Sequence, residues 1–385
     1  MKSLGFGACC ALLWFASSVS AAPGYTLSAV ADPAGTPGGV LQLGGFNNAG
    51  QLAGTWLDGN NAAVPFLYTP TLGFTSLLPA GAVPSGFFGT SVNDLNNNGQ
   101  AVGQFQGRAW QFGPSGGAVP GTGTSSNAIG VNDAGQVIGW QGGDGERYLH
   151  TPGQGSVPLP PMSWLTDINN NGQVLLGLGA GPYADVHTYD VATATATPVP
   201  IDPSLGLAVP AHFNDRGDVL VSQGTTAGEL WSVVHHADGS STRLPDLAGA
   251  GRSELAVDIN NRGQVVGRSL GDGTGPFVPR LFLYTPGEGM VDLIALIDPV
   301  TLNGWDSLHP LFINDHGAIA GLGLHNGAYE VCVMTGLAAP VPDPAAAGLA
   351  GIGLAGVWAR VRRRRQATAA PASRSRANHT ECPVL

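Results

Sequence analysis

Cysteine is scarce in this sequence of 385 residues, which contains four. Cys9 and Cys10 lie close to the N-terminus, and Cys382 lies in the terminal tail. Only Cys332 remains in the body of the chain, within the apolar run EVCVM. A disulfide scaffold is therefore excluded, and we expect a domain that is stable through its core, with Cys332 as a small buried apolar side chain.

Charged residues are also few, at 11% of the chain. Residues 22–340 hold 24 acidic side chains and eight arginines, so this part carries sixteen units of net negative charge. Such a charge repels nucleic acid and excludes it as an expected partner. Acidity favours solubility and is by itself no evidence for a metal site.

Long amphipathic helical patterns are absent, whereas Gly (59 residues) and Pro (29 residues) are abundant. Hydrophobic residues make up 43% of the chain, which is enough for a packed core and excludes a disordered low-complexity chain. This composition predicts many short strands joined by tight turns.

The first 21 residues have the pattern of a secretory signal peptide. Lys2 precedes a short apolar run, and small residues lead to Ala21, after which we expect cleavage. The run is too short for a membrane anchor, which is the alternative. The sequence therefore predicts an exported protein.

A nine-residue motif recurs seven times along the chain, with 36 to 54 residues between successive copies. Its first position is always apolar, the second always Asn, the third Asn or Asp, and the fifth always Gly. The copies are FNNAGQLAG (46–54), LNNNGQAVG (95–103), VNDAGQVIG (131–139), INNNGQVLL (168–176), FNDRGDVLV (213–221), INNRGQVVG (259–267) and INDHGAIAG (313–321).

The motif predicts the turn of a β-hairpin. An Asn side chain stabilises the start of a turn by bonding to backbone two residues on, and Gly supplies a positive φ. The expected turn glycines are Gly50, Gly99, Gly135, Gly172, Gly217, Gly263 and Gly317.

A second signature, an aromatic-apolar strand such as RYLHTP (147–152), follows most copies. Each unit then reads as four antiparallel strands in about 45 residues, the size of one propeller blade. A β-solenoid needs shorter coils, and a two-sheet sandwich does not give seven copies of one unit. We therefore predict an all-β fold, a β-propeller of about seven four-stranded blades spanning residues 22–340.

The last copy runs out at AYEVCVMTG (328–336) without a fourth strand. The mature N-terminus begins with GYTLSAV (24–30), a strand that precedes the first copy. We expect this strand to complete the seventh blade and to close the ring, which removes exposed sheet edges.

The Asn-Asn-x-Gly-Gln-Val-x-Gly hairpin with its aromatic-apolar strand resembles the HAF-type extracellular repeat of secreted bacterial proteins. The resemblance covers nearly all of residues 24–337 and implies a repeated extracellular β-unit with no established activity. The chain departs from the pattern where FLY or RAW replaces His-Ala-Phe, and where copies four and five lose the final Gly.

Residues 341–366 contain a Pro-Asp-Pro turn, an apolar stretch (345–359) and an arginine cluster, in that order. The stretch is short for a stable span and suits a transient anchor, with the arginines kept on the cytoplasmic side. This order resembles the PEP-CTERM sorting signal, which implies an exosortase of Gram-negative bacteria as partner. The alternative is an ordinary C-terminal anchor. The sorting positions implied are Val341, Pro342, Asp343, Pro344, Arg362, Arg363, Arg364 and Arg365.

Asp343 stands where that pattern usually has Glu, and a tail of residues 367–385, which we expect to be disordered, extends beyond the usual end.

Three turns begin like a calcium loop of the form Asp-x-Asn-x-Asn-Gly. The bidentate Glu expected at position 12 is Phe105 in the first copy and Leu178 in the second, and Arg262 replaces a ligand in the third. Turn geometry explains these residues, so we expect no metal and no cofactor. The weak calcium candidates are Asp94, Asn96, Asn98, Asp167, Asn169 and Asn171.

No nucleophile elbow, zinc-protease motif or phosphate-binding Gly loop is present. The only histidine cluster, His235-His236, we interpret as a solvated strand end. Most tryptophans are expected to pack between blades, although Trp164 and Trp305 could stack on sugar rings at one mouth of the propeller.

These features predict a non-enzymatic, exported surface or matrix protein that associates with extracellular polysaccharide in a biofilm. One alternative is a secreted lyase or glycosidase whose carboxylates gather at the propeller channel, because propellers assemble sites from distant residues. A calcium-dependent adhesin is the second alternative.

Overall fold

The computed structural model describes residues 24–30, 39–58, 60–83, 85–86, 89–113, 116–160, 164–178, 185–201, 207–224, 230–247, 254–269 and 280–336. The chain divides into two units, residues 1–337 and residues 338–385, and every element named below belongs to the first. The predicted signal peptide, sorting segment and tail lie outside the described residues.

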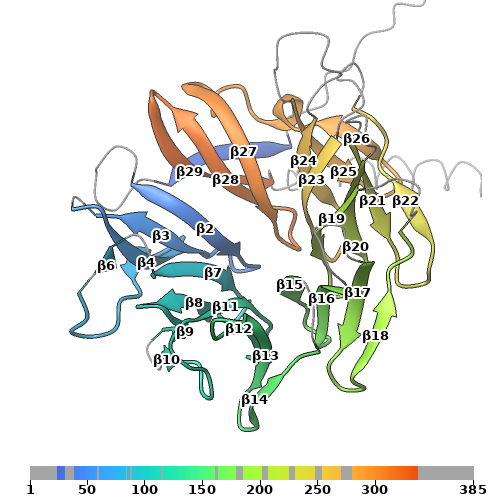
Figure 1. Ribbon diagram of the computed structural model, residues 1–385. Coiled ribbons are helices and arrows are strands. Elements are labelled where there is room, and N and C mark those ends of the chain that lie inside the picture. The colour runs from blue at the N-terminus through green and yellow to red at the C-terminus, as the bar shows by residue number, and fades with distance from the viewer. Residues whose placement is uncertain are drawn as a thin grey trace, which may run out of the picture. The chain divides into compact units, whose positions relative to one another are not determined.

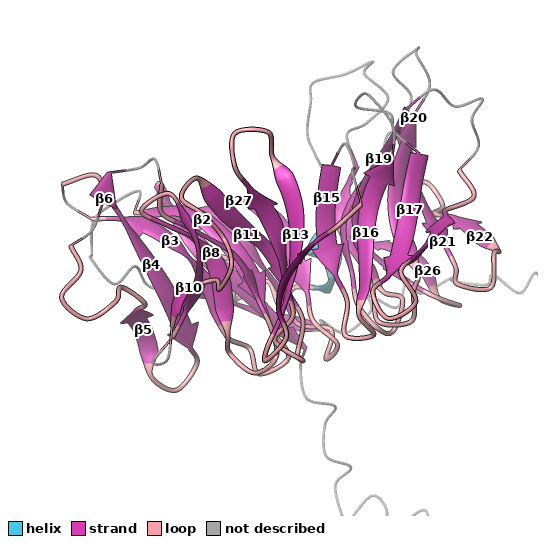
Figure 2. Ribbon diagram, turned by 60° about the horizontal axis from the view of Figure 1, so that its bottom comes forward, coloured by secondary structure: helices cyan, strands magenta, loops and turns pink. Residues whose placement is uncertain are grey.

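Almost every element in these ranges is a β-strand, as Figure 2 shows. The exception is a short 3-10 helix, η2 (Ile294–Leu296). Within the described ranges, no helix has both the length and the apolar character needed to cross a membrane.

The strands form seven antiparallel sheets arranged around a centre as the blades of a β-propeller, which confirms the predicted fold (Figure 1). In six sheets the four main strands follow sequence order from the centre outwards, and in the seventh the N-terminal strand takes the outermost place. The first sheet gains a short fifth strand, β6 (Ser85–Gly86), beside its third.

The strand bounds follow one scheme in all blades. The innermost strands are β2 (Val40–Phe46), β7 (Ser91–Leu95), β11 (Ser126–Val131), β15 (Trp164–Ile168), β19 (Leu207–Phe213), β23 (Glu254–Ile259) and β27 (Trp305–Ile313). The second strands are β3 (Leu52–Leu57), β8 (Ala101–Phe105), β12 (Val137–Gln141), β16 (Gln173–Leu178), β20 (Val219–Gly224), β24 (Val265–Ser269) and β28 (Ile319–His325). The third strands are β4 (Ala62–Thr69), β9 (Arg108–Phe112), β13 (Glu146–Thr151), β17 (Asp185–Asp190), β21 (Leu230–His235), β25 (Arg280–Thr285) and β29 (Ala328–Gly336). The outermost strands are β5 (Gly73–Ser76), β10 (Gly117–Ala118), β14 (Gly155–Pro158), β18 (Thr195–Pro198), β22 (Ser241–Arg243), β26 (Gly289–Asp292) and β1 (Tyr25–Val30).

The N-terminal strand closes the ring, as the sequence predicts. β1 pairs antiparallel with β29, from Tyr25 opposite Gly336 to Val30 opposite Val331. The Tyr25 hydroxyl donates a hydrogen bond to the Gly317 carbonyl at 2.9 Å, and so fixes the strand to the last turn. The seventh blade therefore consists of both ends of the described chain.

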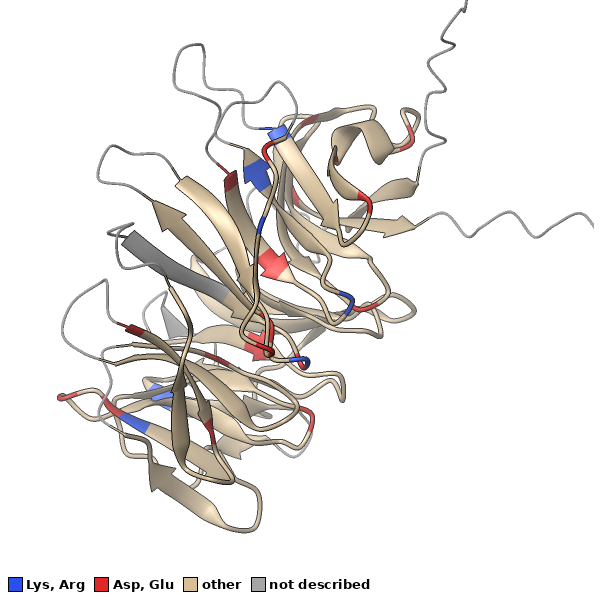
Figure 3. Ribbon diagram, turned by 90° about the vertical axis from the view of Figure 1, so that its right-hand side faces the viewer, with Lys and Arg blue, Asp and Glu red and all other residues tan. Residues whose placement is uncertain are grey.

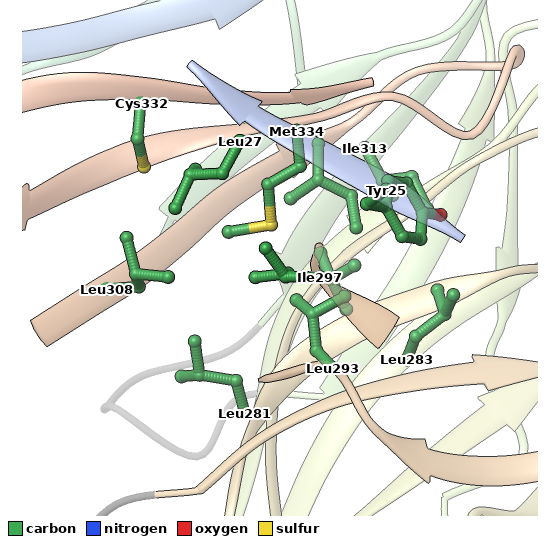
Figure 4. Packing of buried hydrophobic residues seen from close by; sticks show 12 residues of the cluster. Tyr25, Leu27, Leu281, Leu283, Leu293, Ile297, Leu308, Ile313, Cys332 and Met334 are labelled. Atoms are coloured by element: carbon green, nitrogen blue, oxygen red, sulfur yellow. The ribbon is translucent and has the colours of Figure 1, made fainter. Parts of the chain in front are cut away.

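The hydrophobic core is divided into layers between neighbouring blades, and each of the seven interfaces has one buried cluster. The second strand explains this division, because successive side chains of a strand point to opposite faces. Val265 packs against the fifth blade and Val266 against the seventh, so both positions are apolar. Figure 4 shows the layer between blades six and seven, where Cys332 is buried as predicted.

Candidate functional site

The repeated turns have the local geometry that the motif predicts. In the first copy, Asn47 Oδ1 accepts hydrogen bonds from the backbone N–H groups of Ala49 (3.1 Å) and Gln51 (3.0 Å). The seven turn glycines have φ angles between 73° and 80°, a region that favours glycine. The oxygen of the motif Asn thus shapes its own turn.

The nitrogen of the same Asn side chain has a different role, because it bonds to the next blade. Asn47 Nδ2 donates to the Asn96 carbonyl at 3.0 Å, and the same bond recurs at every blade interface, at 2.9–3.1 Å. The donors, all buried, form a closed ring of Asn47, Asn96, Asn132, Asn169, Asn214, Asn260 and Asn314.

The third motif position forms a second closed ring beside the first. The backbone N–H of each of these residues donates to the side-chain Oδ1 of its neighbour, at 2.7–2.9 Å. The ring consists of Asn48, Asn97, Asp133, Asn170, Asp215, Asn261 and Asp315.

These rings explain the residue types that the motif permits. The inter-blade bond of the second position needs an amide N–H, which Asp lacks, so all seven copies have Asn. The third position needs only an acceptor oxygen, which Asn and Asp both provide. The absence of Asp at the second position was the sequence signal for this bond, and the turn interpretation overlooked it.

The carboxylates of the second ring are separated by amides. No two of Asp133, Asp215 and Asp315 are neighbours in the ring, and Asn261 Nδ2 donates to both Asp215 Oδ2 (2.8 Å) and Asp315 Oδ2 (3.0 Å). The order of Asp and Asn therefore avoids repulsion between adjacent carboxylates.

The turns line a cavity of about 180 Å³ at the centre of the propeller. Its wall contains all members of both rings, together with Asp94, Asp167 and the apolar residue that opens each motif. Pockets for small organic ligands usually measure about 300–1,000 Å³, so this cavity is small.

Four ionisable side chains converge where the innermost strands bulge, one position before the motif. Every innermost strand has a register shift there, for example between Ala256 and Asp258. His212 Nδ1 lies 3.5 Å from Asp167 Oδ2 and 3.9 Å from Asp258 Oδ1, so it bridges blades four and six. Asp94 belongs to the same group, because its electrostatic interactions with Asp167 and His212 shift its pKa.

The environment of this channel cluster (Asp94, Asp167, His212 and Asp258) changes its ionisation. Desolvation, reinforced by the charge of Asp167, raises the pKa of Asp94 to about 7. Desolvation also raises the pKa of Asp258. For His212, desolvation opposes the charged form, but the hydrogen bond with Asp167 and the three carboxylates outweigh it and raise the pKa to about 9.

All three carboxylates accept the N–H group of the following residue, and two of them also accept one from another blade. Asp94 accepts the N–H groups of Leu95 (2.7 Å) and Val131 (2.7 Å), and the second of these lies in the next blade. Asp258 accepts the N–H groups of Ile259 and Ile313 in the same way. The cluster thus joins blades as well as concentrating charge.

The weak calcium candidates are engaged by the protein. Asn96 and Asn169 belong to the first ring, while the side chains of Asn98 and Asn171 donate to carbonyls of the next turn. Asp94 and Asp167 lie in the channel cluster. Within the described ranges, no group of three or more His, Cys, Asp or Glu side chains could hold a metal ion.

The tryptophans proposed for sugar stacking pack within the fold. Trp305 is partly buried against the core and stacks on His325, with ring centroids 4.5 Å apart. Trp164 packs partly buried against the layer between blades four and five.

The expectation of a solvated strand end at His235-His236 is wrong for His235. Its side chain is buried in the sheet and bonds to Ser241 Oγ at 2.8 Å, because its strand position faces a neighbouring blade. His236 Nδ1 bonds to Asp218 at 2.9 Å, a pairing that no sequence motif indicated.

Neither a protein-family model nor a curated protein matches the chain. Among solved structures, it is similar to an oligogalacturonate lyase in complex with manganese, with 11% identity and a TM-score of 0.54, covering 82% of this chain and 98% of that one. It is also similar to the Dos1 propeller (11% identity, TM-score 0.43, 80% and 84% covered) and to TolB from Acinetobacter baumannii (9%, 0.39, 74% and 63%). At these identities the likeness to the lyase shows the propeller fold alone.

Proposed function

We propose that this chain is an exported, non-enzymatic repeat protein of the cell surface or extracellular matrix that associates with exopolysaccharide. The observation that carries the proposal is that the polar side chains of the repeated turns bond to neighbouring blades. Both Asn-containing rings bond blade to blade, and the cavity that they line is smaller than usual ligand pockets. The motif therefore supports a scaffold.

The two ends of the sequence support export to the cell surface or matrix. A signal peptide pattern ends at Ala21, and the PEP-CTERM-like segment begins at Val341. The net negative charge of residues 22–340 suits a soluble extracellular protein. Figure 3 marks the acidic and basic positions of the described residues. We expect an exosortase-type enzyme to process the C-terminus after transient anchoring in the membrane.

The ends of the mature protein test the proposed export and sorting. Mass spectrometry of the chain recovered from the cell surface should give an N-terminus at Ala22 and no peptide beyond Arg365. A mature protein that retains Gln366 onwards contradicts the sorting proposal.

The channel cluster favours a second candidate, a secreted polysaccharide lyase or glycosidase. A carboxyl group with a raised pKa beside other carboxylates is the arrangement that acid–base chemistry on sugars uses. Asp94 would donate a proton and Asp167 would accept one.

A panel of polysaccharides incubated with the purified protein separates the two candidates. A scaffold binds a polysaccharide in pull-down and leaves its length unchanged. Release of reducing ends or unsaturated sugars that Asp94→Asn abolishes would establish the enzyme and overturn the non-enzymatic proposal. The control Asp144→Asn alters an exposed turn residue outside the channel.

A further inference from the structure

In blade five, ionisable residues replace a contact that recurs in three other blades. In blades one, three and six, the motif Gln donates its Nε2 to a Thr hydroxyl at the end of the third strand, at 3.3–3.5 Å. The blade-five equivalents are Asp218 and His236, because Val219 pairs with His235 as Val137 pairs with His150. A neutral contact has thus become an ionisable pair at both of its positions.

The pair extends to a hydroxyl group. Asp218 Oδ1 lies 2.9 Å from His236 Nδ1, and His236 Nε2 lies 2.9 Å from Thr242 Oγ1. The order carboxylate, imidazole, hydroxyl is the arrangement that activates a hydroxyl nucleophile in acyl transfer.

The carboxylate is held in the form that this role needs. Asp218 Oδ2 accepts hydrogen bonds from Asn214 Nδ2 (3.1 Å) and Arg216 Nε (3.0 Å). Burial opposes the charge of Asp218, but the bonds from His236, Asn214 and Arg216 outweigh it and lower the pKa. An ionised Asp218 keeps the His236 proton on Nδ1, so Nε2 can accept the proton of Thr242.

The residue that carries the hydroxyl is only partly buried. Thr242 lies in β22, the outermost strand of the blade (Figure 2), and its residue is half-buried. The His236 side chain is 30% exposed, whereas Asp218 is 6% exposed. The group is therefore buried at the carboxylate end and partly exposed at the imidazole and hydroxyl end.

We propose that Asp218, His236 and Thr242 form a nucleophilic site that takes the acyl group of small carboxylic esters, of the kind found as O-acetyl groups on sugars. Thr242 Oγ forms a bond to the ester carbonyl carbon, and its proton passes to His236 Nε2. The carbon–oxygen bond to the leaving alcohol breaks, and that alcohol takes the proton. Water then attacks the acyl carbon while His236 Nε2 takes its proton. The bond from that carbon to Thr242 Oγ1 breaks, the proton passes from His236 to Thr242 Oγ1, and the free acid leaves. Asp218 reaches the cavity wall through its bond from Asn214, whereas Thr242 lies on the outermost strand, and the proposed chemistry does not depend on the scaffold function.

The test uses the purified full chain and p-nitrophenyl acetate as probe. We expect p-nitrophenol release, with an acetyl group on Thr242 located by peptide mass spectrometry. Thr242→Val, which removes the hydroxyl at constant shape, should abolish that adduct, and Thr242→Ser should keep it. Asp218→Asn and His236→Asn should slow acetylation about 100-fold. The rise of the rate with pH should disappear in His236→Asn.

His316→Asn is the matched control, because His316 is an exposed turn histidine of blade seven and should leave the rate unchanged. Thermal unfolding of each variant separates loss of the site from loss of the fold. A folded wild type without an adduct on Thr242, or equal rates for wild type and Thr242→Val, would overturn the proposal. Polysaccharide binding is measured separately, so either function can fail alone.

Discussion

At the scale of single residues, one side chain serves two structures. The oxygen of each motif Asn closes its own turn, and its nitrogen bonds to the next blade. An unpaired buried polar group costs more than a hydrogen bond gains, so these positions tolerate little change.

Asn132→Asp tests that double role with an almost isosteric change. Asp keeps the turn oxygen but lacks the N–H groups that reach Asn169 O (3.1 Å) and Gln136 Oε1 (2.8 Å). It also directs an anionic oxygen at these acceptors in a site that is 2% exposed. We expect a loss of about 3 kcal/mol in the free energy of unfolding, measured by urea denaturation. The exposed Asn60→Asp is the control; equal stability of both variants would contradict the role.

Calcium should have no effect on this protein, because the turn side chains that resemble a calcium loop bond to backbone of the next blade. Ligands that bind only the folded state raise the melting temperature. We therefore expect EDTA or added calcium to shift it by less than about 1 °C, with magnesium as the control for ionic effects. A clear rise specific to calcium would restore the adhesin hypothesis.

At the scale of elements, a blade depends on close packing at the ninth motif position. A Cβ at Gly139 would lie 2.1 Å from the Asn127 carbonyl oxygen and 2.5 Å from the Tyr148 hydroxyl. The glycine thus admits both the bulged inner strand and the aromatic ring of the third strand. This explains why the motif Gly and the aromatic signature occur in the same unit.

Gly139→Ala should destabilise the protein by about 3 kcal/mol, because backbone and a buried ring must both move. Gly117→Ala is the control, since a Cβ there meets nothing within 4 Å. Differential scanning calorimetry should show a lower melting temperature for the first variant only. If both variants melt at the wild-type temperature, the strands around Gly139 can move apart at little cost, and the glycine is not required there.

The sequence was sufficient for the fold because the repeat encodes local geometry. The positive φ of the turn glycines and the alternating burial along each strand follow from residues within one blade. The last repeat lacks a fourth strand, and the N-terminal strand supplies it. The sequence allowed carboxylates to gather at the channel but could not say which. Asp94, Asp167, His212 and Asp258 come from four blades and meet only when the ring closes. For the same reason, His236 gave no signal without its partner Asp218.

At the scale of the whole molecule, the channel cluster makes stability depend on pH. Both Asp94 and His212 have raised pKa values in the folded state, so folding takes up protons. The contribution of Asp94 is full below its ordinary value of 3.8 and is lost as pH rises to about 7. That of His212 is full below 6.5 and is lost as pH rises to about 9.

We therefore expect the free energy of unfolding to fall between about pH 4 and pH 9. Urea titrations across this range measure it. Asp94→Asn should flatten the lower part of the profile and His212→Asn the upper part, with His316→Asn as the control. A wild-type profile that is flat between pH 6.5 and pH 9 would contradict the assignment to His212.

Hydrogen exchange can show whether the two rings join the seven blades into one cooperative unit. The backbone amides of the third motif position donate the bonds of the second ring. We expect all seven amides to exchange slowly and at one rate, set by global unfolding, and Asn132→Asp to accelerate all seven equally. Fast exchange in the wild type, or acceleration confined to the blades beside Asn132, would contradict it.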